Sequence, residues 1–197
     1  MNRKSMINLF LIATGVALLF RAFVIEDYRI ASNSMFPNLE TGKMIFVSKS
    51  SFSLKLPFSS YEIIKFSSPK RSDIVAFSLP GKNQRTYVKR VVAIAGDRVE
   101  LKNGDLYING ELSKYSDEAP ASRLVASASG MVKSEQILGH EPHKVTVDKD
   151  KLPNYGPVDV PPNHFFALGD NRSDSIDSRS WGPVPYSNLK GRVVTSF

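Results

Sequence analysis

A serine and a lysine are the residues of this chain whose types and surroundings could support covalent chemistry. Ser34 lies in the segment Ser-Asn-Ser-Met-Phe-Pro, which begins at residue 32. Pro37 fixes its own φ and disfavours helix at the residue before it, so Ser34 is expected on a turn or an extended loop. A serine hydroxyl is a poor nucleophile until a base takes its proton, and a desolvated neutral lysine can be that base.

Lys89 is the candidate base, within the strand-like segment Tyr-Val-Lys-Arg-Val-Val that begins at residue 87. If the strand alternates, Lys89 shares a face with Tyr87 and Val91, and apolar neighbours lower the pKa of a lysine by disfavouring its ammonium form. Arg90 would then point the other way and stay solvated. The segment alone also fits an edge-strand lysine that discourages aggregation.

A dense polar segment forms the third candidate region. Residues 169–179 read Gly-Asp-Asn-Arg-Ser-Asp-Ser-Ile-Asp-Ser-Arg and follow an apolar run. Asp170 and Arg172 are two residues apart, as are Asp177 and Arg179, so charge-assisted hydrogen bonds can brace the loop. A hydroxyl of the same loop could orient a lysine amine.

The positioning elements begin with an apolar run at residues 6–25, interrupted by only four polar, glycine or charged residues. Twenty helical residues span about 30 Å, the thickness of a bilayer's hydrocarbon core. Two basic residues precede the run and two acidic residues follow it, which predicts residues 1–5 in the cytoplasm and residues 26–197 outside it. A cleavable signal peptide is disfavoured because no small-x-small cleavage site follows. The length and the basic start disfavour a buried core helix.

After this run the pattern predicts short β-strands at residues 44–47, 73–77, 87–95, 144–147 and 165–168. Residues 99–108 read as a hairpin closed by Asn103-Gly104 in a type I′ turn, and Asn109-Gly110 marks the next turn. Residues 111–162 look like a long excursion or an inserted subdomain. Residues 48–68 carry several apolar side chains, Phe52 and Phe66 among them, which could lie on the bilayer or fold onto the core.

Composition narrows the classes of function. The chain has 197 residues and no cysteine, which allows one domain with a real core and excludes disulfides and zinc-thiolate sites. Residues 26–197 carry 23 basic and 19 acidic side chains, a net charge of +4, without a basic stripe, so no nucleic-acid partner is predicted. His140 and His143 flank a proline and lack further ligands, so no metal site is predicted there either.

Together these segments resemble the bacterial type I signal peptidases, membrane-bound proteases that use a Ser-Lys dyad to remove signal peptides. The resemblance runs in order through nearly the whole chain. It includes the apolar anchor, the Ser-x-Ser-Met-x-Pro box, the Gly-x-x-Ile-x-Val segment at residues 42–47 and the Pro-Lys-Arg-Ser-Asp-Ile-Val segment at residues 69–75. It continues with Tyr-Val-Lys-Arg-Val-Val, Gly96-Asp97 and the polar loop.

The resemblance implies a mainly β fold: an antiparallel, β-barrel-like, signal-peptidase-like catalytic domain with one N-terminal transmembrane helix in the plasma membrane. It implies Ser34 as nucleophile, Lys89 as general base, and the Ser32 hydroxyl with the Ser34 N–H as oxyanion hole. It also implies that Ser175 orients the lysine and that Asp177 and Arg179 form a bracing pair near the site. Asp170, Asn171 and Arg172 match a structural turn of the family. Substrate pockets are expected to involve Ile30, Met35, Leu39, Tyr87 and Val88.

The implied partners are signal-peptide-bearing preproteins and the lipid bilayer, and no metal or organic cofactor is required. The chain departs from the family at Ala31, Asn33 and Lys43, where proline, glycine and aspartate are usual, and these changes bear on rate and substrate preference. Two alternatives share the features above. One is a specialised maturation peptidase of the same clan, and the other is a catalytically silent, membrane-tethered binding domain.

Overall fold

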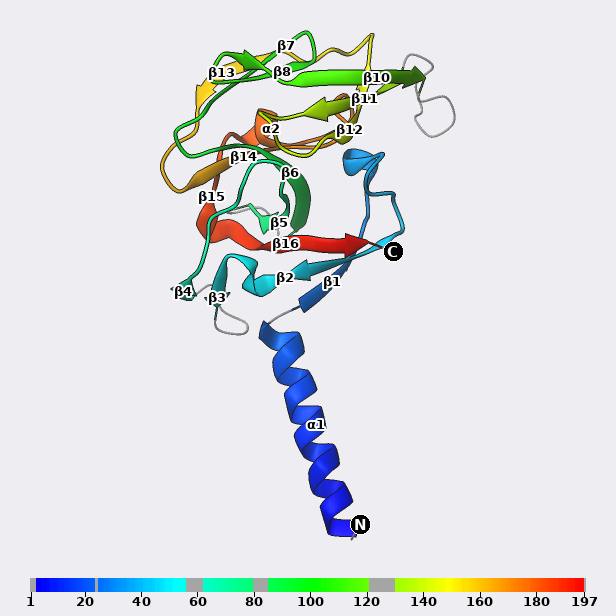
Figure 1. Cartoon of the computed structure of the whole chain (residues 1–197), viewed down its shortest axis with the longest axis vertical. Coiled ribbons are helices and arrows are strands. Elements are labelled where there is room, and N and C mark those ends of the chain that lie inside the picture. The colour runs from blue at the N-terminus through cyan, green and yellow to red at the C-terminus, as the bar shows by residue number, and fades with distance from the viewer. Residues whose placement is uncertain (1–2, 24, 56–61, 80–84, 121–129, 197) are drawn as a thin grey trace.

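The computed structural model describes residues 3–23, 25–55, 62–79, 85–120 and 130–196, and within them the fold is mainly antiparallel β-structure (Figure 1). A long N-terminal helix, α1, extends away from the strands. The helices are α1 (Arg3–Phe23) and α2 (Ser178–Trp181), with short 3-10 turns η1 (Asn33–Met35), η2 (Lys49–Ser51) and η3 (Tyr186–Asn188).

The central element is a curled seven-stranded sheet with the order β1-β2-β16-β5-β6-β14-β15. Its strands are β1 (Ile25–Arg29), β2 (Met44–Ser48), β5 (Ile74–Ser78), β6 (Thr86–Ile94), β14 (His164–Leu168), β15 (Val184–Pro185) and β16 (Leu189–Ser196). All of its neighbouring strands pair antiparallel. The predicted strands at residues 44–47, 73–77, 87–95 and 165–168 are confirmed as β2, β5, β6 and β14.

The remaining described strands form three smaller sheets. Their strands are β3 (Ser53–Lys55), β4 (Glu62–Lys65), β7 (Arg98–Lys102), β8 (Asp105–Ile108), β9 (Glu111–Leu112), β10 (Lys114–Pro120), β11 (Gly130–Gln136), β12 (His143–Asp148) and β13 (Tyr155–Asp159). They pair as β3-β4, as β13-β7-β8-β9 and as β10-β11-β12. In Figure 1 the β10–β12 sheet lies at the end of the molecule opposite α1.

Local turn chemistry explains the β7–β8 hairpin. Asn103 has φ 50° and Gly104 has φ 84°, both in the left-handed region that a type I′ turn requires. Asn109 and Gly110, with φ 55° and 83°, make the next reversal in the same way. The predicted hairpin and the second turn are therefore confirmed, and the predicted strand at residues 144–147 is confirmed as part of β12. The strands β9–β13 occupy residues 111–162, and the boundaries of an inserted subdomain there remain a prediction.

The N-terminal helix differs in its limits from the predicted apolar run. It begins at Arg3, ends at Phe23, and is followed by β1 from Ile25, so Ile25 belongs to the sheet. Among the described residues, no helix meets the length and hydropathy needed to cross a membrane. Six large apolar side chains of α1 are at least half exposed: Met6, Ile7, Leu9, Phe10, Leu11 and Ile12.

Buried apolar side chains form three clusters around the central sheet. The first lies between β6, β14 and the β7–β8 hairpin, and the second packs Val75, Phe77 and Val91 against Phe165. The third gathers side chains of η1, β2 and β5. In the segment 48–68, Phe52 is buried in the second cluster, whereas Phe66 is 58% exposed. Residues 56–61 of that segment lie outside the described residues.

Candidate active site

The nucleophile turn follows β1 and is held by its own backbone. Ser34 lies in η1, where Phe36 N donates to Asn33 O at 3.0 Å and Leu39 N donates to Met35 O at 2.9 Å. Ser34 itself is half-buried, while Ser32 and Asn33 are exposed. The predicted turn at Ser34 is therefore confirmed, and it leaves the hydroxyl at the surface of the sheet.

Lys89 meets this turn from the middle of β6. Its Nζ donates a hydrogen bond to Ser34 Oγ at 2.5 Å. The strand pairing sets Lys89 opposite Val75 of β5, in the apolar cluster that Tyr87 and Val91 also join. Tyr87 and Val91 share this cluster whereas Val88 packs against the third one, as alternation along a strand predicts. That Lys89 lies on the face of Tyr87 and Val91 stays a prediction.

Burial dominates the electrostatics of Lys89. The residue is 4% exposed, and desolvation lowers the pKa of its amine from 10.5 to about 8. The charges of Asp177 and Asp170 oppose this shift, and the charge of Arg179 adds to it. Within the part of the chain that the structure describes, Lys89 forms no ion pair. A substantial neutral fraction of the amine near pH 8 follows from this environment.

Ser32 places a second hydroxyl beside the nucleophile. Its Oγ lies 3.1 Å from Ser34 Oγ. Ser32 is exposed and has extended backbone geometry as the residue before η1, with φ −147° and ψ 158°. The hydroxyl therefore reaches the open side of the dyad, whereas Lys89 approaches from the buried side.

The polar loop 169–179 packs directly under the nucleophile turn. Asn171 N donates to Ser34 O at 3.1 Å, and Asn171 Nδ2 donates to Asn33 O at 3.3 Å. A Cβ added at Gly169 would collide with Ser34 O and with Ser175 Oγ. Glycine is thus required at this position because the two segments approach so closely.

Asp177 and Arg179, the predicted bracing pair, form an ion pair and also contact the backbone of the polar loop. Arg179 Nε and Nη2 each donate to a carboxylate oxygen of Asp177 at 2.7 Å. Asp177 also accepts from Gly169 N at 3.0 Å and caps the short helix α2. Arg179 reaches back to Arg172 O at 2.6 Å and to Ser175 O at 3.2 Å. These contacts fix the loop that faces Lys89.

Ser175 lies in this loop, but its hydroxyl does not contact Lys89 by a hydrogen bond. Ser175 Oγ is buried and has no hydrogen-bond partner among the described residues. The orienting role implied by the resemblance therefore remains a prediction. The hydroxyl is therefore not committed to any other hydrogen bond with a described residue.

Arg90 corrects one expectation. It was expected to stay solvated on the far face of the strand, yet it is 6% exposed. Its Nε and Nη2 each donate to an oxygen of Asp170 at 2.8 Å, and its Nη1 donates to Ser72 O at 2.9 Å. The buried carboxylate of the polar loop draws the guanidinium inward, because an unpaired buried carboxylate is costly.

The predicted substrate-pocket residues fall into two groups. Ile30, Met35 and Leu39 are buried in one apolar cluster, with Val88 packed against it. Tyr87 instead joins the second cluster, where its ring centroid lies 4.9 Å from that of Trp181. Adjacent residues of a strand point to opposite faces, which separates Tyr87 from Val88. Their roles toward substrate remain predictions.

Some polar contacts of the site were not foreseen. Asn38 Nδ2 donates to Asp170 Oδ2 at 2.7 Å and to Lys144 O at 2.6 Å, joining the nucleophile turn to β12. Ser178 Oγ accepts from Ala167 N at 3.0 Å. The only sequence signal for these residues is their polar type beside the three candidate segments.

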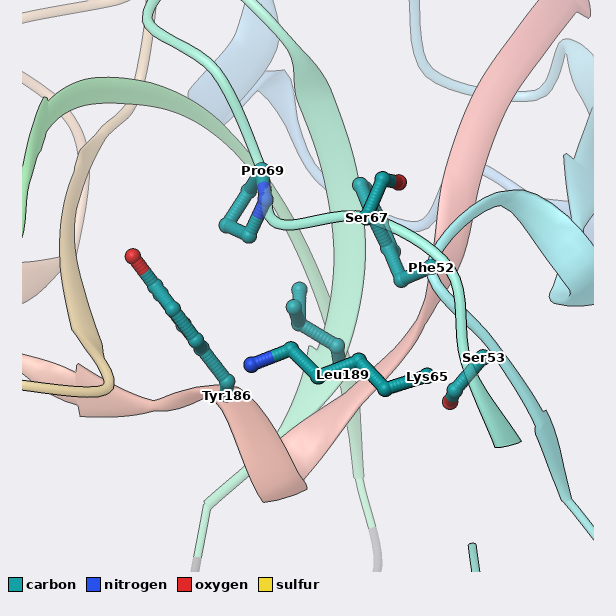
Figure 2. Close-up of a pocket in the computed structure, with 7 residues that line it drawn as sticks. All are labelled: Phe52, Ser53, Lys65, Ser67, Pro69, Tyr186 and Leu189. Atoms are coloured by element: carbon teal, nitrogen blue, oxygen red, sulfur yellow. The ribbon is translucent and has the colours of Figure 1, made fainter. Parts of the chain in front are cut away.

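A pocket elsewhere on the domain does not include the dyad (Figure 2). It is lined by Phe52, Ser53, Lys65, Ser67, Pro69, Tyr186 and Leu189. In Figure 2 the Lys65 amine points toward the Tyr186 ring, and Nζ lies 4.9 Å from the ring centroid. In the described part of the chain no cluster of three or more histidine or acidic residues could hold a metal ion.

Comparison with known proteins places the chain in a family. The family described as signal peptidase, peptidase S26, matches residues 3–197. Signal peptidase I of Pseudomonas aeruginosa is 32% identical in an alignment of 193 positions, and the match covers 90% of this chain and 66% of that protein. Signal peptidase I of Bacillus caldolyticus is 31% identical in an alignment of 188 positions, and the match covers 92% of this chain and 84% of that protein.

One solved structure is also similar. Signal peptidase I from Enterococcus faecalis V583 is 29% identical and covers 66% of this chain and 100% of its own, with a TM-score of 0.41. A score of this size does not establish a common fold. The chain spans about two thirds (66%) of the length of its Pseudomonas relative. With the family match extending over residues 3–197, this chain belongs to the signal peptidase family, peptidase S26.

Proposed function

We propose that this chain is a serine endopeptidase that removes signal peptides from exported preproteins with Ser34 and Lys89 as its dyad. The observation that carries the proposal is the 2.5 Å contact between Ser34 Oγ and the buried amine of Lys89. A lysine whose pKa falls to about 8 is a competent base near neutral pH. Its relatives named signal peptidase I support the choice of substrate.

The chemistry proceeds through an acyl-enzyme. Neutral Lys89 takes the proton of Ser34 as Oγ attacks the scissile carbonyl, and the ammonium then gives that proton to the leaving amine. The hydroxyl of Ser32 and the N–H of Ser34 donate to the oxyanion, each contributing about 3 kcal/mol of transition-state stabilisation. Lys89 next activates a water molecule that hydrolyses the ester and frees Ser34.

The supporting residues set the geometry of this reaction. Asp177 and Arg179 hold the polar loop against the nucleophile turn, and Ser175 orients the lysine amine. The preprotein lies extended beside a strand and adds main-chain hydrogen bonds. The preprotein residues that precede the cleavage site fit against apolar side chains of this chain. These side chains are Ile30, Met35, Leu39, Tyr87 and Val88.

We further propose that α1 anchors the chain in the plasma membrane, with residues 1–5 in the cytoplasm and the strands outside. The support is the run of exposed apolar side chains on α1, which water solvates poorly. Anchoring in the membrane of the substrate raises the effective concentration of the two partners. Recovery of the full chain in the soluble fraction after cell lysis, without detergent, would contradict this anchor.

The activity is tested on the full chain in detergent with a preprotein that carries a signal peptide. We expect the wild type to cleave it, and Ser34→Ala and Lys89→Ala each to lose at least about a thousandfold in rate. Circular dichroism of each variant checks the fold. Retention of most of the activity by a folded Lys89→Ala variant would refute the dyad.

A panel of different preproteins separates general signal-peptide processing from the two alternative functions. Cleavage of many supports general processing, cleavage of one supports a specialised maturation peptidase, and binding without cleavage supports a silent domain.

A further inference from the structure

A buried carboxylate lies in the sheet at the end of the molecule opposite α1, outside the polar loop and the two segments that carry Ser34 and Lys89. Glu135 on β11 is fully buried, with 0% of its surface exposed. It is the middle residue of a cross-strand row in the three-stranded sheet, opposite Tyr115 of β10 and His143 of β12. A charge this deep is unfavourable unless it is paired and hydrogen-bonded.

The neighbouring strands hold this carboxylate in place. Tyr115 OH donates to Glu135 Oε1 at 2.6 Å, and the same hydroxyl accepts from Leu106 N at 2.8 Å. His143 Nε2 lies 3.3 Å from Glu135 Oε2 on the other side. The hydrogen bond from Tyr115 thus fixes Oε1, while His143 approaches Oε2 without hydrogen-bond geometry.

Glu135 is aimed at the polar loop of the active site. Arg172 Nη1 donates to Glu135 Oε1 at 3.0 Å, and Arg172 Nη2 pairs with Oε2. Arg172 is 1% exposed, and its Nε donates to Gly169 O at 3.2 Å. Two parallel N–H bonds fix the plane and the direction of the guanidinium.

The same sheet also holds the backbone of that loop. Arg172 N donates to Thr146 O and Thr146 N donates to Asp170 O, each at 2.8 Å, so β12 pairs with the loop as a strand would. Between these contacts, Asn171 N donates to Ser34 O. A short path therefore leads from Glu135 through Arg172 and Asn171 to the backbone of the nucleophile.

We propose that Glu135 is a positioning residue of the Ser34–Lys89 dyad and acts through Arg172 on the loop beneath the nucleophile. The proposal rests on the proposed peptidase function. It gives the β10–β12 sheet a part in setting the geometry of the reaction. A displacement of the loop by a fraction of an ångström moves the backbone of Ser34 relative to Lys89, and misalignment of the reacting groups lowers the rate of the chemical step.

The test uses Glu135→Gln, which keeps the shape of the side chain and removes its charge. Glu100→Gln is the matched control, since Glu100 forms a 2.9 Å ion pair with Lys102 on a different sheet. We expect Glu135→Gln to lower kcat on a preprotein by at least about tenfold with KM within twofold, and Glu100→Gln to change neither. Rates are expressed per folded molecule.

A second readout does not depend on peptide cleavage. The chain has no cysteine, so Ser34→Cys introduces a single thiol beside Lys89. Its alkylation by iodoacetamide is followed against pH, and we expect a midpoint below the ordinary thiol value of about 8.5. Adding Glu135→Gln moves the midpoint back toward that value by at least about half a pH unit, and adding Glu100→Gln leaves it in place.

The outcomes separate this proposal from the proposed function. If the wild type cleaves no preprotein, the peptidase function fails, and the thiol readout alone decides the role of Glu135. If Glu135→Gln does not fold, Glu135→Asp keeps the charge on a shorter arm and should show both effects to a lesser degree. Unchanged kcat per folded molecule together with an unchanged alkylation profile overturns the proposal.

Discussion

Lys89 and Arg90 are adjacent cations on β6 that are almost equally buried, yet the fold treats them in opposite ways. Lys89 is 4% exposed and Arg90 is 6% exposed. Arg90 receives two oxygens of Asp170, whereas Lys89 meets the hydroxyl of Ser34 and forms no ion pair with a described residue. One face of the strand therefore stabilises a charge, and the other face disfavours it.

The side-chain chemistry explains why each residue suits its place. A guanidinium keeps its proton in proteins and matches a carboxylate with two parallel N–H groups, so Arg90 suits a permanent structural pair. An amine loses its proton when burial lowers its pKa, so Lys89 can be neutral near pH 8. The contrast indicates that burial without a partner marks a functional cation, while burial with a partner marks a structural one.

The largest effect is expected when Lys89 is replaced by arginine, a cation that keeps its proton in proteins. Lys89→Arg keeps the charge but removes the base, and we expect cleavage of a preprotein to fall by at least about a thousandfold. Initial rates in detergent measure the effect. Arg90→Lys is the matched control, because it makes the reverse exchange at the adjacent position and keeps a positive charge beside Asp170. It should retain far more activity, and equal losses in the two variants would contradict the distinction.

Removing the arginine tests the structural half of the comparison. Arg90→Met leaves Asp170 buried with Asn38 as its remaining side-chain partner, and we expect the free energy of unfolding to fall by about 3–5 kcal/mol. Denaturant unfolding in detergent, followed by circular dichroism, gives the value. A loss below about 1 kcal/mol would show that the pair does not hold the loop.

Removing the lysine should instead stabilise the fold. The pKa of Lys89 is about 8 in the folded chain against 10.5 for an ordinary lysine, so the unfolded chain binds more protons between these values and stability rises with pH across that window. Below pH 8 the buried ammonium costs up to about 3 kcal/mol. Lys89→Met should therefore be more stable than the wild type at pH 7, with a difference that shrinks toward pH 10.5.

The same denaturant curves, taken from pH 7 to pH 10.5, test this prediction. Lys65→Met is a suitable control for the loss of a lysine that lies over an aromatic ring instead of inside the core. A Lys89→Met variant that is less stable than the wild type at pH 7 would mean that the amine stabilises the fold, as Arg90 does.

Local features of the fold could be predicted from the sequence. The turn at Asn103-Gly104 follows from two residues that tolerate positive φ, and the β-strand at residues 87–95 follows from its run of apolar, β-branched residues. Both features depend on residues within a few positions of each other. Such patterns specify a conformation or a face without knowledge of the rest of the chain.

Long-range pairs could not be predicted in this way. Arg90 was expected in solvent because its partner Asp170 lies 80 residues along the chain, and nothing near Arg90 indicates it. Glu135 and Arg172 are 37 residues apart and meet only once β11 has packed on the polar loop. The meeting of Ser34 and Lys89 was expected from the family resemblance, since residue types alone did not require it.

The most direct test of the account is the titration of the Lys89 amine itself. NMR of the full chain in detergent with isotope-labelled lysine, with the Lys89 signal assigned by its absence in Lys89→Met, reports the pKa. We predict a midpoint near 8, which the rise of kcat/KM with pH should match. A midpoint near 10.5, in an enzyme that is fully active at pH 7, would contradict the claim that neutral Lys89 activates Ser34.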